Sequence, residues 1–161
     1  MAYLLSLLLS FITVTAFAPA GTLADLESEK AELLRLHRTH REAHFKTDAD
    51  MLMARSPEVL ISVSRGKVHR SSREEGRKRF EEYFRGAKYY EWDDMEEPTV
   101  RVSDDASMAW MITRLKVRRV QKDAAGVERE ERFVYAGLTT YEKRGGKWMR
   151  VANASTFEPP N

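Results

Sequence analysis

The hydrophobic pattern changes abruptly near the start of the chain. No charged side chain occurs before Asp25, and the run Leu4–Phe17 is rich in leucine, with only serine and threonine as polar residues. A run of this length followed by small residues, here Ala18 and Ala20, is typical of a secretory signal peptide and its cleavage site. The N-terminus is therefore interpreted separately from the rest of the chain.

We expect residues 1–24 to be a signal segment and residues 25–161 to form one exported domain. Cleavage near Ala20 or Ala24 would release this domain to the periplasm or the medium, with no stable membrane insertion afterwards. The segment lacks the usual lysine or arginine near its start. An uncleaved anchor over Ala2–Ala20 is therefore the alternative.

Spacings of three and four residues predict helices in the first half of the domain. Residues 25–45 place leucines and then histidines on one face of a long helix. Thr47 and Asp50 have the spacing of a capping box, which predicts a short second helix through Met53. Serines at 71 and 72 each precede a glutamate by three residues, which predicts a third helix that ends near Arg85.

Alternation of apolar and polar residues predicts strands in most of the remaining chain. Residues 58–70 read as a hairpin that turns at Arg65 and Gly66. The acidic segment 91–97, just before Pro98, reads as a solvated loop rim. Further strands are expected at 99–102, 107–121, 127–141 and 147–157. Helices followed by an antiparallel meander indicate an α+β fold with the helices on one face of the sheet.

Composition narrows the range of functions. The chain has no cysteine, which excludes disulfides, thiolate chemistry and cysteine-ligated metals. Its 27 basic and 25 acidic residues nearly balance. The basic residues of 114–122 face glutamates at 128–131 across a turn, which favours ion pairing between the strands. No nucleic-acid partner is therefore expected.

Four segments resemble the nuclear transport factor 2-like superfamily, which includes ketosteroid isomerases, scytalone dehydratase and SnoaL-like polyketide cyclases. These segments are Ala43–Asp50, Val59–Gly66, Val102–Trp110 and, most specifically, Thr140–Trp148. The resemblance covers roughly residues 26–157. It implies a curved antiparallel or mixed sheet with the N-terminal helices in its concave face, that is, a cone-shaped α+β barrel around a largely apolar pocket. It also implies a homodimer formed through the outer face of the sheet.

The helix face that bears His37, His40 and His44 is the main candidate site. Along this face the residues change from leucine to histidine. We therefore expect the three rings to line the pocket, with His37 nearest its edge. His40 and His44 have the spacing of metal ligands, but Arg38 and Arg41 would oppose a cation, and no metal or cofactor is expected. Three aromatic residues are expected to contact the ligand as well: Trp92, Trp110 and Tyr135.

The resemblance also tests one specific chemistry. In ketosteroid isomerases a tyrosine on this helix polarises the substrate carbonyl, and the matching position here is His40. Their catalytic carboxylates correspond to residues 61–65 and 133–140, which contain no aspartate or glutamate. Isomerase chemistry of that type therefore lacks its base.

Two functions remain open. The preferred one is a non-catalytic or weakly catalytic module that binds a small, largely apolar molecule. The alternative is a lyase or isomerase in which His40 or His44 acts as acid or base, assisted by Trp92 and Asp93. A histidine–carboxylate pair in the pocket, with a shifted histidine pKa, would favour the enzyme. In either case we expect Trp148 and Phe157 to be buried against Leu33, Leu36 and Phe80.

Overall fold

The computed structural model describes residues 22–158, which form three helices and seven strands. Helices α1 (Leu23–Lys46) and α2 (Ala49–Met53) come first. A hairpin of β1 (Val59–Ser64) and β2 (Lys67–Ser72) follows, and then α3 (Arg73–Phe84). The remaining strands are β3 (Ala87–Asp94), β4 (Thr99–Val102), β5 (Met108–Lys122), β6 (Glu128–Arg144) and β7 (Lys147–Phe157).

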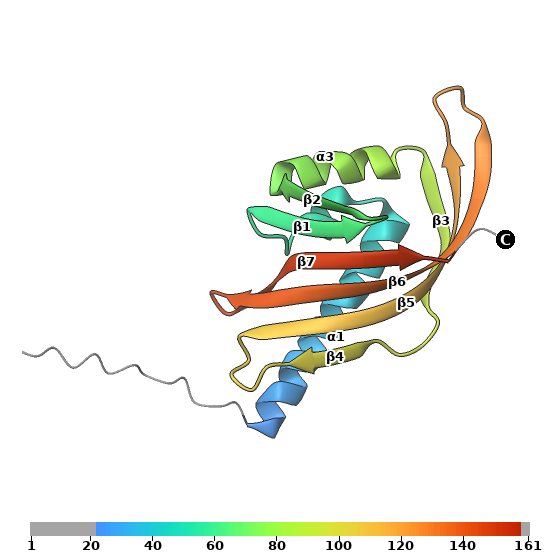
Figure 1. Ribbon diagram of the computed structural model, residues 1–161. Coiled ribbons are helices and arrows are strands. Elements are labelled where there is room, and N and C mark those ends of the chain that lie inside the picture. The colour runs from blue at the N-terminus through green and yellow to red at the C-terminus, as the bar shows by residue number, and fades with distance from the viewer. Residues whose placement is uncertain (1–21, 159–161) are drawn as a thin grey trace, which may run out of the picture.

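The strands form one sheet in the order β2-β1-β7-β6-β5-β3, with β4 paired to β5 as well. All pairs are antiparallel except β1 and β7, which run parallel from Ile61 opposite Ala152 to Ser64 opposite Ser155. The sheet is therefore mixed. It curves around α1, which crosses behind β5, β6 and β7 in Figure 1, while α3 lies beside the β1–β2 hairpin. The predicted α+β cone with helices in the concave face is confirmed.

Helix α1 follows from its sequence almost as predicted. It begins with a capping box, in which Thr22 accepts a hydrogen bond from the backbone N–H of Asp25 and the Asp25 carboxylate accepts one from the backbone of Thr22. Its inner face buries Leu33, Leu36 and Ala43. Predicted burial of the two leucines is confirmed, because the same periodicity that forms the helix directs them to the sheet.

The helix junction differs from the prediction. Thr47 does not cap α2; it ends α1 in the left-handed conformation, at a φ of 51°. Asp48 is the N-cap of α2, and its carboxylate accepts a hydrogen bond from the N–H of Met51 at 2.8 Å. The predicted capping box at Thr47 is therefore wrong by one residue, because the chain must reverse direction before α2 can start.

The acidic segment before Pro98 is a second correction. Its first half, through Asp94, belongs to β3 and is not a loop rim. Trp92 of this strand is buried, and the neighbouring carboxylates are directed to α1, where Asp93 pairs with Arg41 at 2.7 Å and Asp94 with His37 at 2.9 Å. The charged side chains of this segment are therefore held by residues of α1, and the segment itself is a strand of the sheet.

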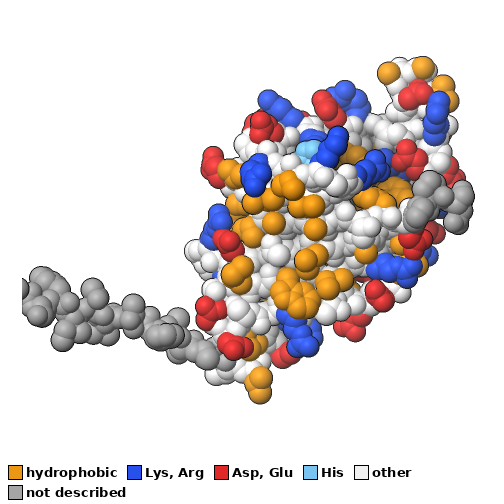
Figure 2. All heavy atoms as spheres, in the orientation of Figure 1, with side chains coloured by type: hydrophobic (Ala, Val, Ile, Leu, Met, Phe, Trp, Pro, Cys, Tyr) orange, Lys and Arg blue, Asp and Glu red, His pale blue; other side chains and the backbone are white. Residues whose placement is uncertain are grey.

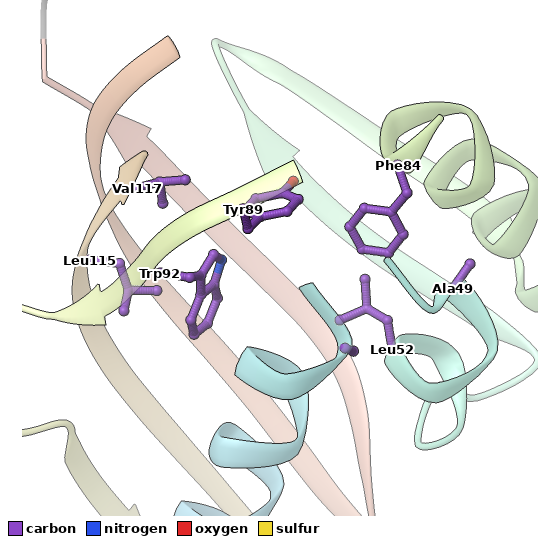
Figure 3. Packing of buried hydrophobic residues seen from close by; sticks show 8 residues of the cluster. Ala49, Leu52, Phe84, Tyr89, Trp92, Leu115 and Val117 are labelled. Carbon is purple, nitrogen blue, oxygen red and sulfur yellow. The ribbon is translucent and has the colours of Figure 1, made fainter. Parts of the chain in front are cut away.

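Two hydrophobic clusters fill the space between the helices and the sheet. Figure 3 shows one of them, in which Trp92 and Tyr89 of β3 point toward Phe84 of α3 and Leu52 of α2. The other joins α1 to β4, β5, β6 and Trp148 of β7. Trp148 is only 2% exposed, as predicted, and its indole N–H donates to Glu29 of α1 at 2.6 Å.

Phe157 and Phe80 are less buried than predicted. Phe157 is 37% exposed because it is the last residue of β7, at the rim of the sheet, where the rings of Phe133 and Tyr135 and the guanidinium of Arg65 lie near it. Phe80 is half-buried and packs against the first cluster from its edge.

The predicted signal segment lies outside the described residues apart from its last three positions, and export stays a prediction. Cleavage near Ala20 would keep Thr22, the N-cap of α1, whereas cleavage near Ala24 would remove it. Within residues 22–158, no helix is long and apolar enough to cross a membrane.

Candidate functional site

A cavity of about 420 Å³ lies between α1, α3 and the concave face of the sheet. All four histidines of the chain line it, together with two arginines and a set of aromatic and hydroxyl side chains. No aspartate or glutamate of residues 22–158 is among the lining residues. The cavity is therefore amphipathic, and its fixed charge is positive.

A bulge between β6 and β7 shapes the floor of the cavity. Tyr141 pairs with Arg150, whereas the preceding Thr140 pairs with Ala152, so β7 contains one extra residue. The extra residue inverts the alternation of faces along the strand. Arg150 before the bulge and Asn153 after it consequently both line the cavity.

His37 forms the edge of the histidine face. It is 7% exposed, and its Nε2 lies 2.9 Å from each carboxylate oxygen of Asp94. Because a carboxylate only accepts, Nε2 carries the hydrogen and Nδ1 is the nitrogen that can accept a proton in the neutral ring. His37 lines the cavity, whereas its partner Asp94 does not.

His44 is held in one tautomer by α1 itself. Its Nδ1–H donates to the carbonyl oxygen of His40 at 2.7 Å, and its ring stacks on Trp92 with centroids 4.7 Å apart. Burial lowers the pKa of His44 to about 4, with the positive charge of Arg150 acting in the same direction. At neutral pH the ring is thus uncharged, and Nε2 is a hydrogen-bond acceptor.

His40 also lines the cavity and is half-buried. Burial is the main cause that lowers its pKa well below the usual value, and the charge of Arg150 lowers it further. Both central histidines are therefore neutral groups, able to exchange hydrogen bonds with a ligand but not to supply a positive charge.

Arg150 supplies the positive charge at the floor. Within the described residues, its guanidinium contacts Ser56 Oγ at 3.4 Å and Met53 Sδ at 3.7 Å, both through Nη2, while Nε is buried with no hydrogen-bond partner. Burial lowers its pKa, yet an arginine stays protonated in proteins. Arg79 of α3, whose guanidinium lies over Phe80, also lines the cavity.

The structure places two of the three predicted aromatic residues at this site. Trp92 and Tyr135 line the cavity, and burial raises the pKa of the Tyr135 hydroxyl. Trp110 does not: it is 38% exposed on the outer face of β5, while its neighbour Met111 faces the cavity. The prediction for Trp110 is therefore corrected, because adjacent residues of a strand point to opposite faces.

The sequence analysis missed Arg150 and Gly137, which both line the cavity. The alternation of faces along a strand could have identified both residues. Arg150 stands two residues after the buried Trp148, and Gly137 lies two residues from Tyr135 and from Thr139, which both line the cavity. A glycine inside a strand often marks a place where another molecule approaches the backbone closely.

The chemistry that this arrangement supports is limited. The segment 61–65, where a ketosteroid isomerase places its base, brings only Ser62 and Ser64 to the cavity. The described residues contain no group of three or more histidine, aspartate or glutamate side chains that could hold a metal ion. What remains is hydrogen bonding by neutral histidines, positive charge from two arginines, and aromatic walls.

Comparison with known proteins gives a fold and no closer relative. No family model and no curated protein matches the sequence. A protein of unknown function from Mycobacterium tuberculosis has a similar structure, with a TM-score of 0.66 and 14% identity over 87% of this chain and 78% of that one. A ketosteroid isomerase-like protein from Erwinia carotovora atroseptica gives 0.60 and 14%, over 86% and 100% of the two chains.

A nuclear transport factor 2-like protein of unknown function from Pseudomonas putida gives a TM-score of 0.62 at 11% identity, over 81% of this chain and 87% of that one. The chain thus has the fold of these nuclear transport factor 2-like and ketosteroid isomerase-like proteins.

Proposed function

We propose that this domain binds a small organic molecule in the cavity between α1, α3 and the sheet, without catalysis or with only weak catalysis. The observation that supports it is the cavity itself, about 420 Å³ in volume and lined by every histidine of the chain. Cavities of several hundred Å³ with apolar walls and a few converging polar groups are typical ligand sites.

The walls indicate the kind of molecule. Phe80, Trp92 and Phe133 offer flat apolar surface, while Ser62, Thr113 and Asn153 offer hydrogen-bonding groups on the sheet side. A compact ligand with an apolar or aromatic body and one polar end would satisfy both. His40 and His44, both neutral, line the same cavity and would orient the ligand by hydrogen bonds.

An enzyme of the lyase or isomerase type is the second candidate, and the His37–Asp94 pair is what favours it. A carboxylate that holds one ring nitrogen leaves the other free to move a proton. However, the histidines with lowered pKa are His40 and His44, and neither has a carboxylate partner. The two features of a general base thus occur on different residues, and binding remains the preferred proposal.

Substitution of His40 tests the proposal. Calorimetric titration of a panel of one- and two-ring aromatic acids, amides and alcohols should find members that bind once per chain. His40→Leu should weaken that binding about tenfold, because one hydrogen bond is lost. It should leave the melting temperature unchanged or higher, since a leucine suits the buried helix face. His40→Ala should weaken binding similarly and lower stability slightly.

Two results would contradict binding at this site. One is the absence of saturable binding by every member of the panel. The other is unchanged affinity in both variants together with a large loss of stability, which would make His40 an ordinary core residue. Mass spectrometry of the recovered ligand separates the two candidate functions: an unchanged molecule is expected from a binding protein, and a converted one from an enzyme.

We further propose that the domain forms a homodimer through the outer face of the sheet. Strand register places two apolar rows there, Trp110–Thr140–Ala152–Ile61 and Ile112–Leu138–Ala154–Val63. Five large apolar residues of these rows are substantially exposed, namely Ile61, Val63, Trp110, Ile112 and Leu138. Figure 2 shows hydrophobic side chains gathered on this face of the sheet. A contiguous exposed patch of this kind is typical of an interaction surface.

A lysine at Trp110 tests the dimer. Sedimentation equilibrium of the unmodified domain should give twice the chain mass, and Trp110→Lys should give the monomer mass, since a symmetric interface receives the unpaired charge twice. Val127→Lys is the control, because Val127 is also exposed but lies at the β5–β6 turn. A monomer before substitution, or dissociation by both variants, would count against this surface.

A further inference from the structure

The starting observation is the isolation of Arg150. Its Nε is buried without a partner, and its other polar contacts are one hydroxyl and one thioether. Of the carboxylates in residues 22–158, none lies within ion-pairing distance of it, and none lines the cavity. Arg79, the other cavity arginine, has no ion pair among these residues either.

A buried arginine elsewhere in the fold has the partners that Arg150 lacks. Arg119 of β5 is buried, and its guanidinium is bound by Glu131 at 2.7 Å and by the hydroxyl of Tyr89 at 3.1 Å. Arg41 and Arg77, on the helices, also have carboxylate partners. Arg150 therefore differs from Arg119 in that no carboxylate of the described residues neutralises its guanidinium.

An unpaired guanidinium inside a protein is unfavourable, because it loses its hydrating water and gains no ion pair in exchange. A carboxylate would restore the balance with two parallel hydrogen bonds, whose geometry matches the planar fork of arginine. Neutral His40 and His44 cannot do so, since they carry no negative charge. A carboxylate that pairs with Arg150 would therefore have to come from a bound molecule.

We propose that the ligand of this cavity is a small organic acid whose carboxylate is bound by Arg150 and whose apolar body lies against Phe80, Trp92 and Phe133. The proposal rests on the proposed function, since it names the chemical class of the molecule bound at the same site. Arg150, on the same face of β7 as Trp148, places the carboxylate at the floor of the cavity, and Arg79 adds a second positive charge.

A matched pair of probes tests the class of ligand. 1-Naphthoate and 1-naphthamide have nearly the same shape, and only the first carries a charge. Calorimetric titration at neutral pH should show the acid binding to the full domain at least about tenfold more tightly than the amide. In Arg150→Gln the ratio of the two affinities should fall close to one, through weaker binding of the acid alone. Arg144→Gln, at the exposed end of β6, should leave the ratio unchanged.

The outcomes are distinguishable. Equal affinity for the two probes in the unmodified domain, or a ratio that survives in Arg150→Gln, would overturn the acid while leaving the cavity as a binding site. Failure of both probes to bind saturably would overturn the binding function and this inference with it. The comparison in the unmodified domain needs no variant, so the inference is testable even where Arg150→Gln folds poorly.

Discussion

Acidification from about pH 7.5 to about pH 4.5 is expected to lower the free energy of unfolding by several kcal/mol, chiefly through His40 and His44. Both rings are neutral in the folded domain because burial lowers their pKa, that of His44 to about 4. In the unfolded chain each takes up a proton near its ordinary pKa of about 6.5. Between these values the unfolded state binds more protons, so stability falls as the pH falls.

The magnitude follows from the shift. His44 alone contributes about 2.5 kcal/mol across this window, and His40 adds to it. Carboxylates held by partners, such as Asp105 with a pKa lowered to about 2, act only at lower pH. The measurement is urea unfolding at a series of pH values. His44→Phe keeps an aromatic ring against Trp92 and should flatten the profile clearly; an equally steep profile in this variant would show that His44 does not titrate as described.

A valine at position 137 is expected to abolish ligand binding while the domain stays folded. Gly137 is in the interior of β6 and lines the cavity. A Cβ added there would meet its nearest atoms at 3.6 Å, which is ordinary contact, so the backbone accepts a side chain. The methyl groups of valine would then occupy space that the ligand needs, and affinity for 1-naphthoate should fall about 100-fold.

The stability of the domain should increase while its affinity for the ligand falls. Valine is favoured in strands and glycine is not, so Gly137→Val should raise the free energy of unfolding by about 0.5–1 kcal/mol. Gly137→Ala is the graded control, with a smaller loss of affinity. Calorimetric titration and urea unfolding of the same samples give both quantities. Affinity retained within a factor of a few in Gly137→Val would mean that the ligand does not lie against β6.

Sequence alone was sufficient for the features that depend on local periodicity. The long stripe of α1, the Ser72 cap of α3 and the turns at Gly66 and Gly145 each follow from a few neighbouring residues, and each lies close to where it was predicted. The histidine face was found for the same reason, since a helical stripe of leucine and histidine is visible without knowing what packs on it.

Sequence patterns failed where a partner distant along the chain decides the outcome. Glu91–Asp94 resembles a solvated charge cluster in the sequence, but Arg41 and His37, more than fifty residues earlier, donate hydrogen bonds to two of its carboxylates. Trp110 was predicted to line the pocket because residue type alone does not show on which face of the sheet an aromatic side chain lies.

What the sequence by itself determined, then, is the class of the fold and the histidine half of the site, because helix and strand periods are short-range properties. The other half was decided only by tertiary structure. The parallel pairing of β1 with β7 joins the β1–β2 hairpin to the rest of the sheet, and the bulge opposite Thr140 brings Asn153 to the same face as Arg150. Whether a buried arginine has a partner depends on which carboxylates the fold brings within a few ångströms of it, and that is a property of the three-dimensional arrangement alone.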